Sequence, residues 1–186
     1  MSQKPDLTFF CLYVNILKRK KDGRDTLLEK ILFRVYGSKK LTRLLRAVSY
    51  ACVIIGVTAF FLLLYLAYLN SLKEAILLSS FFAVPFFVVS ISRRIFNAPR
   101  PYEIYEFYKI APKDKKGQSF PSRHVFSSVI IAVFAFNYSA LLGALLVVLS
   151  LSLALSRILL GIHFIRDCLA GALIGAISAA IGILLL

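Results

Sequence analysis

The stretch AVSYACVIIGVTAFFLLLYLAYL, residues 47–69, decides the fold class of this chain. It carries no charged side chain, and a helix needs roughly 20 apolar residues to cross the hydrocarbon core of a bilayer. The segment is too long for a strand of a membrane barrel and lacks the alternation of such strands. It therefore predicts a transmembrane α-helix.

Four further apolar segments follow, separated by short polar breaks. They cover residues 75–92, 123–137, 139–156 and 164–186. Since only helices and closed barrels satisfy the backbone inside a bilayer, we expect an all-α integral membrane bundle of about five transmembrane helices. The last segment carries small residues at helical spacing, which would let another helix approach closely: Gly171, Gly175, Ala179 and Gly182.

The residues before position 47 follow a different pattern. Leu27, Leu28, Ile31, Leu32 and Val35 repeat at helical spacing among basic residues, and a second such pattern follows Gly37. This is typical of amphipathic helices that lie on a membrane surface. We therefore divide the chain into a basic amphipathic membrane-surface segment, residues 1–46, and a transmembrane domain, residues 47–186.

The composition agrees with a membrane protein and indicates its partners. Hydrophobic residues make up 59% of the 186 residues, and the mean hydropathy is +0.79, which is too apolar for a soluble domain. The formal net charge is +14, and basic residues gathered at membrane boundaries favour anionic phospholipid head groups as partners. Because no nucleic-acid-binding motif is present, we expect no nucleic-acid partner, and no obligate protein partner is evident.

The cysteines do not form a recognisable site. Cys11, Cys52 and Cys168 make no CxxC pair, and two of them fall in apolar segments, where cysteine behaves as a small hydrophobic residue. The sequence therefore predicts neither a disulfide nor a zinc site.

The few ionisable residues near the later apolar segments are the best candidates for chemistry. The chain has two histidines, His124 and His163, and Asp167 is the only acidic residue after Asp114. His163 and Asp167 are four residues apart, so on a helix they would share one face. A carboxylate that binds one imidazole nitrogen leaves the other free to act as a nucleophile.

Three short motifs contain these residues. They read Arg93-x6-Arg100-Pro101, Pro121-Ser122-Arg123-His124 and Ser156-Arg157-x3-Gly161-x-His163-x3-Asp167. In order and spacing they resemble the type 2 phosphatidic acid phosphatase superfamily, whose pattern is Lys-x6-Arg-Pro, Pro-Ser-Gly-His and Ser-Arg-x5-His-x3-Asp. The resemblance covers residues 75–186.

The resemblance implies a membrane lipid phosphatase that works through a covalent phosphohistidine. His163 would attack the phosphorus, Asp167 would orient it, and His124 would protonate the leaving oxygen. The phosphate oxygens would be held by arginines, by a serine and by amides at a helix N-terminus: Arg93, Arg100, Arg157 and Ser122. No metal ion and no cofactor are implied, and the chain has no cluster of residues with metal-ligand spacing.

Two positions depart from the family pattern. Arg93 stands where the family usually has lysine, which keeps the charge but replaces a point donor with a forked one. Arg123 replaces a glycine that lets the backbone come close to phosphate. Our hypothesis is that Arg123 is an additional clamp in substrate binding, for a second or a sugar-linked phosphate.

The head group of the lipid is not readable from the motifs. Within the family we favour a lipid A 1-phosphatase, because the chain is small and basic and carries the additional arginine. The alternatives are an undecaprenyl diphosphate phosphatase, a phosphatidylglycerophosphate phosphatase, a lipid phosphotransferase and a non-catalytic lipid-binding protein.

The orientation in the membrane gives conflicting signals. With five spans, the basic N-terminal segment and the motif loops lie on the same face, which the positive-inside rule assigns to the cytoplasm. Many relatives work at the outer face instead. From the family likeness we expect a cell inner membrane protein whose site faces the periplasm, against the charge count.

Overall fold

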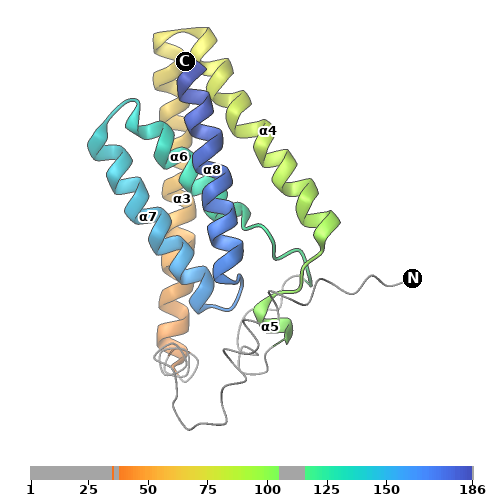
Figure 1. The fold of residues 1–186 in the computed structure, drawn as a ribbon. Coiled ribbons are helices and arrows are strands. Elements are labelled where there is room, and N and C mark those ends of the chain that lie inside the picture. The colour runs from red at the N-terminus through yellow and green to blue at the C-terminus, as the bar shows by residue number, and fades with distance from the viewer. Residues whose placement is uncertain (1–34, 36–37, 105–115, 186) are drawn as a thin grey trace.

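The computed structural model describes residues 35, 38–104 and 116–185. All regular secondary structure among these residues is α-helical (Figure 1). Its long helices are α3 (Lys39–Asn70), α4 (Leu72–Phe96), α6 (Arg123–Phe136), α7 (Ala140–Leu159) and α8 (Ile165–Leu185), and α5 (Pro101–Ile104) is a single turn. The prediction of an all-α membrane bundle is confirmed.

The helix boundaries follow from capping residues in the sequence. The hydroxyls of Ser38, Ser71 and Ser139 accept hydrogen bonds from backbone amides in the first turns of α3, α4 and α7, at 3.1–3.3 Å. Serine in this position satisfies an amide that has no partner within the helix. At the other end of α4, Asn97 adopts a left-handed conformation with φ of 38°, which asparagine tolerates better than most residues. These polar residues separate the apolar segments.

Four of the helices, α3, α4, α7 and α8, are long and apolar enough to cross a membrane. Their outward faces carry large apolar side chains that the bundle leaves exposed, such as Phe61, Tyr65, Leu151 and Leu173. Such surfaces suit contact with lipid and not with water. The described part of the chain is therefore a multi-pass membrane protein.

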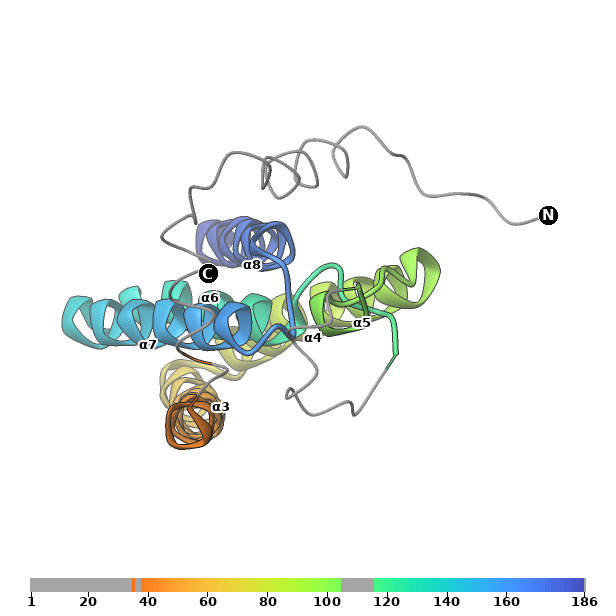
Figure 2. The same cartoon turned by 90° about the horizontal axis from the view of Figure 1, so that it is seen from below.

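The fifth segment, α6, is short but central. Its 14 residues rise only about 21 Å, less than the thickness of a bilayer core. Eight of them are buried, and α3, α4, α7 and α8 all contact it. Seen along the bundle, α6 and α7 lie between α3 and α8 (Figure 2). The helix that begins at the Pro-Ser-Arg-His motif is therefore held on several sides.

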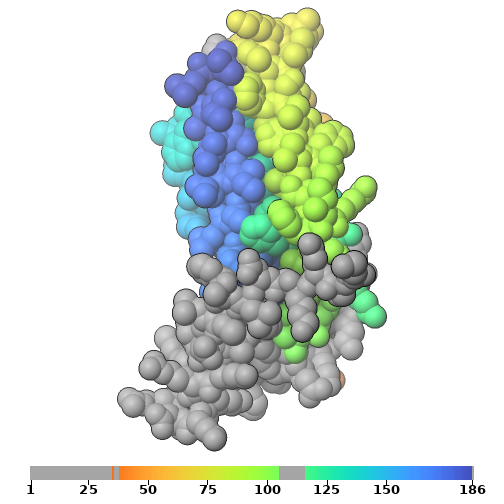
Figure 3. All heavy atoms as spheres, turned by 45° about the vertical axis from the view of Figure 1, so that its right-hand side comes forward, coloured from red at the N-terminus to blue at the C-terminus, as the bar shows by residue number. Residues whose placement is uncertain are grey.

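The small residues of α8 allow a close contact with α6. Gly171, Gly175, Ala179 and Gly182 are all buried, and a Cβ atom at Gly171 would lie 2.5 Å from the carbonyl oxygen of Ser122. In Figure 3, α4 and α8 lie side by side, and atoms at the start of α6 show between them. The small-residue face therefore allows α8 to press against the backbone of α6.

We expect Gly171→Ala to destabilise the protein by about 1–3 kcal/mol, because the added methyl would overlap a backbone atom that cannot easily move. Thermal unfolding in detergent would measure the change. Gly56→Ala in α3 is the control, since nothing lies within 4 Å of a Cβ there, and alanine favours a helix over glycine. Equal midpoints for the two variants would contradict the close contact.

The expected boundary between positions 46 and 47 falls inside α3. Residues 39–46 form the first turns of this helix and continue into the apolar stretch without a break. No proline or glycine occurs among residues 39–55 to interrupt the helix. The surface helix expected over residues 27–35 lies outside the described residues, apart from Val35.

Candidate active site

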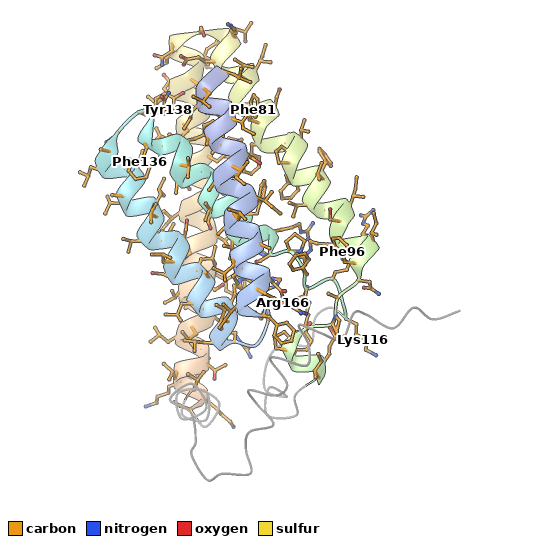
Figure 4. The ribbon with its side chains drawn as sticks, viewed as in Figure 1. Phe81, Phe96, Lys116, Phe136, Tyr138 and Arg166 are labelled. Carbon is orange, nitrogen blue, oxygen red and sulfur yellow. The ribbon has the colours of Figure 1, made fainter. Side chains whose placement is uncertain are left out.

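The three motifs meet at one end of the bundle, where α4 and α7 end and α6 and α8 begin; we call this the site end (Figure 1). His124 interacts electrostatically with Arg93, Arg123, Arg157 and His163, and Arg100 lies close enough to interact with Arg93 and Arg157. In Figure 4 the site end is marked by Arg166, and the opposite end by Phe136 and Tyr138. Every sequence-predicted site residue therefore lies in or next to one cluster.

His163 and Asp167 form a buried pair at the start of α8. Their side chains are 2% and 0% exposed, and Nδ1 of His163 lies 3.7 Å from Oδ2 of Asp167. The two residues do not share a helix face as the sequence spacing predicted, because His163 precedes α8 in a loop. Instead, the Asp167 carboxylate accepts a hydrogen bond from the Phe164 amide at 3.0 Å. Asp167, the third residue of α8, thus caps the start of its own helix.

A serine that the sequence analysis missed joins this pair. The Ser119 hydroxyl donates to Oδ2 of Asp167 at 2.5 Å and lies 3.4 Å from Nδ1 of His163. Ser119 is fully buried. The only signal in the sequence is its position two residues before the Pro-Ser-Arg-His motif, which does not by itself predict a contact.

Arg93 connects the last turn of α4 to the segment before α6. Its Nη1 donates to the carbonyl oxygens of Pro121 at 2.6 Å and Ser119 at 3.4 Å, and only 4% of the side chain is exposed. Its Nε is buried with no hydrogen-bond partner among the described residues. Part of this guanidinium therefore fixes the protein backbone, and part stays available to another acceptor.

Arg100 is also held in place by neighbouring groups. Its Nε donates to the carbonyl oxygen of Gly117 at 2.9 Å, and its guanidinium lies over the ring of Tyr102, 5.8 Å from the centroid. The Glu103 carboxylate accepts from the amides of Arg100 and Gly117 at 3.3 and 2.7 Å.

Arg157 lies in the last turn of α7. Like that of Arg93, its Nε is buried and has no hydrogen-bond partner in the described part of the chain.

The start of α6 is fixed by its contact with α8. The Ser122 amide donates to the carbonyl oxygen of Asp167 at 2.9 Å. Ser122 is fully buried, and its side chain makes no capping hydrogen bond to α6. Arg123 and His124 follow in the first turn, where the helix dipole favours an anion.

A family model described as the PAP2 superfamily matches residues 74–186 of the 186-residue chain. The chain belongs to the PAP2 superfamily. The match covers the three motifs, nearly all of α4, and helices α5 to α8. PAP2 phosphatases are hydrolases, and the apolar helices place this member in a membrane.

Two solved structures resemble this one in fold. The crystal structure of Aquifex aeolicus LpxE has a TM-score of 0.63 at 24% identity, over 86% of this chain and 96% of that chain. The first transmembrane PAP2 type phosphatidylglycerolphosphate phosphatase from Bacillus subtilis has a TM-score of 0.57 at 16% identity, over 97% and 96%. No curated protein matches this chain.

In this PAP2 member an apolar cavity adjoins the histidine of the second motif. The cavity has a volume of about 440 Å³ and is lined by residues of α3, α4, α6 and α7. Arg123 and His124 line it together with apolar side chains such as Val57, Phe82 and Phe86. The guanidinium of Arg123 lies 5.8 Å from the centroid of the Phe86 ring. The residue that replaces the family's glycine therefore borders both the cluster and the cavity.

Burial favours the neutral form of the third motif's histidine. It lowers the pKa of His163 below its ordinary value of 6.5, although the nearby carboxylate of Asp167 acts in the opposite direction. The neutral imidazole therefore persists to lower pH than in a solvent-exposed histidine. A neutral imidazole has the free lone pair that a nucleophile requires.

Proposed function

We propose that this protein is a membrane lipid phosphatase that removes a phosphate from a lipid through a covalent phosphohistidine on His163. The observation that carries the proposal is the buried His163–Asp167 pair beside several arginines, next to an apolar cavity. A buried nucleophile with an orienting carboxylate has no use in a protein that only binds lipid.

The proposed reaction has two steps. In the first, Nε2 of neutral His163 attacks the phosphorus, the bond from phosphorus to the lipid oxygen breaks, and His124 gives its proton to that oxygen. In the second, water attacks the phosphohistidine, His124 takes a proton from the water, and inorganic phosphate leaves as the nitrogen–phosphorus bond breaks. His124 thereby returns to its starting form.

The arginines would stabilise the charge on the transferring group. Phosphoryl transfer spreads charge over three equatorial oxygens, so catalysis depends on fixed donors around them. The buried Nε groups of Arg93 and Arg157 lack hydrogen-bond partners among the described residues. They would therefore be available to donate to phosphate oxygens. Arg100, Ser122 and the first amides of α6 would complete the binding site.

A lipid leaving group fits the cavity beside His124. If His124 protonates the leaving oxygen, the group attached to that oxygen must lie near it, and the apolar lining suits a hydrocarbon chain. Among lipids we favour lipid A phosphorylated at position 1, in line with the fold likeness to LpxE and with Arg123 as a clamp for a further phosphate. The alternatives are undecaprenyl diphosphate and, in line with the second likeness, phosphatidylglycerophosphate.

The proposal is tested by phosphate release from these three lipids by the purified protein in detergent, with and without a chelator. We expect release that survives the chelator, because no step requires a metal ion. If none of the three lipids is hydrolysed, the proposal is refuted. Loss of activity in the presence of chelator would refute the metal-independent mechanism. A labelled lipid product in place of inorganic phosphate would indicate a phosphotransferase.

The role of Arg123 is tested by returning it to the family residue. We expect Arg123→Gly to lower kcat/KM about tenfold or more for a substrate with a second phosphate, because one charge-assisted hydrogen bond is lost, and to change it little for a monophosphate. The ratio of the two kcat/KM values is the measurement. Arg94→Gly, at an exposed position outside the cluster, is the control, and an unchanged ratio in the Arg123 variant would exclude the clamp.

We further propose that the protein lies in the cell inner membrane with the site end toward the periplasm. Reaction of a cysteine introduced at exposed Arg94 with an impermeant thiol reagent in intact cells tests this orientation. Labelling only after the inner membrane is opened would place the site in the cytoplasm, as the positive-inside rule predicts.

A further inference from the structure

Ser119 occupies a position between the two members of the His163–Asp167 pair. The direct distance from Nδ1 of His163 to Oδ2 of Asp167 is 3.7 Å, longer than an ordinary hydrogen bond. The Ser119 hydroxyl lies closer to both groups, at 3.4 Å from Nδ1 and 2.5 Å from Oδ2. The hydrogen-bond contacts that join the imidazole to the carboxylate therefore run through this hydroxyl.

The donors and acceptors along this path determine where the imidazole proton lies. A serine hydroxyl has one proton to donate and two lone pairs to accept with. The Ser119 proton is used by the Asp167 carboxylate, since an ionised carboxylate can only accept. The contact with His163 must therefore have Nδ1–H as donor and the serine oxygen as acceptor, so the lone pair of the neutral ring is on Nε2.

We propose that Ser119 is a positioning residue that holds His163 in the Nδ1–H tautomer by bridging it to Asp167. This inference rests on the proposed function, in which Nε2 of His163 is the nucleophile. Ser119 acts through His163 and does not touch the substrate.

The surroundings of Ser119 keep its hydroxyl in this position. The Ser119 amide donates to the carbonyl oxygen of Ala98 at 2.8 Å, and the Ser119 carbonyl accepts from Arg93. Its side chain is fully buried, so water does not compete for the hydroxyl. The loop before α6 is thereby tied to the end of α4, and the bridge to α8 has little freedom to move.

The tautomer can be measured directly because the chain has only two histidines. In full-length protein labelled with ¹⁵N-histidine, the ring nitrogen shifts distinguish the two neutral tautomers and follow protonation with pH. His124→Gln leaves the signals of His163 alone. We expect the Nδ1–H form to dominate when Ser119 is present and a mixture of tautomers, with an altered titration, in Ser119→Ala.

The kinetic constants of matched variants provide a second test. We expect Ser119→Ala to lower kcat about 10–100-fold, as loss of an orienting partner does elsewhere, with little change in KM, and Ser119→Thr to recover most of it because it keeps the hydroxyl. Ser150→Ala is the control, since Ser150 is also buried and its hydroxyl donates within α7 to the carbonyl oxygen of Leu146. If the alanine variant does not fold, Ser119→Cys takes its place, because a thiol of similar size is a weak donor and a weak acceptor and should shift the tautomer in the same direction.

The two measurements separate this proposal from the proposed function. An unchanged tautomer and titration in Ser119→Ala or Ser119→Cys, as in Ser150→Ala, would overturn the positioning role even if the parent hydrolyses lipid. If the tautomer changes in Ser119→Ala while the parent protein releases phosphate from no lipid, the bridge is supported and the phosphatase function is refuted.

Discussion

Replacement of His163 by alanine should lower phosphate release by at least about ten thousandfold, as removal of a nucleophile does in other enzymes with covalent intermediates. The imidazole supplies the atom that would bond to phosphorus, and Asp167 and Ser119 are arranged around its other nitrogen. Substrate binding should change much less, because the arginines remain. Release of phosphate from labelled lipid measures the first quantity, and retention of unhydrolysed lipid measures the second.

The other histidine provides the contrast for this experiment. With His124→Gln we expect a large loss on lipid substrates but a much smaller loss on nitrophenyl phosphate, whose leaving group needs no proton. His163→Ala should be inactive on both. Rapid quenching with a labelled substrate should trap phosphate on the parent protein and none on the His163 variant. Phosphate release by His163→Ala at the parent rate would contradict the phosphohistidine mechanism.

Loss of the charge at Arg93 should lower kcat/KM by about a hundredfold or more in Arg93→Met, since removal of one fixed donor to a developing charge costs that much elsewhere. The substitution also removes the hydrogen bonds to the carbonyl oxygens of Ser119 and Pro121. Arg93→Lys should stay within about tenfold of the parent, because lysine keeps the charge and is the usual family residue. Initial rates across substrate concentrations measure both variants.

The neighbouring arginine is the control for Arg93. Arg94 is exposed at the same turn of α4, so Arg94→Met removes an equal charge without touching the cluster and should change kcat/KM by no more than a few-fold. Equal losses in the two methionine variants would mean that total charge at the site end, and not the placement of Arg93, determines activity.

The fold was predictable because the bilayer sets strict conditions on the sequence. Polar residues that cap helices separate several of the apolar segments, as Ser71 and Ser139 do. The convergence of the motifs was also predictable. A motif at the end of one span and another at the start of the next must lie at the same side of the membrane, as Arg157 and Asp167 do.

The contacts within the site were less predictable. The four-residue spacing of His163 and Asp167 suggested one helix, but the positive φ of Gly161 belongs to a loop that ends before α8. The role of Ser119 depends on where a loop crosses the end of α8, and a single sequence does not encode that distance in any periodic pattern. The same is true of Arg93, whose partners are backbone carbonyls and so leave no trace in side-chain identities.

The length of α3 has a consequence for how substrate reaches the site. Its 32 residues extend about 48 Å, whereas a bilayer core is roughly 30 Å thick. Tyr50 lies near Arg157, so residues 39–46 project past the cluster, with Lys39, Lys40 and Arg43 exposed. Each such cation attracts an anionic lipid by about 1 kcal/mol. We therefore expect anionic lipids that diffuse within this leaflet to accumulate around α3. Turnover should then depend on the mole fraction of competing anionic lipids as well as on that of the substrate.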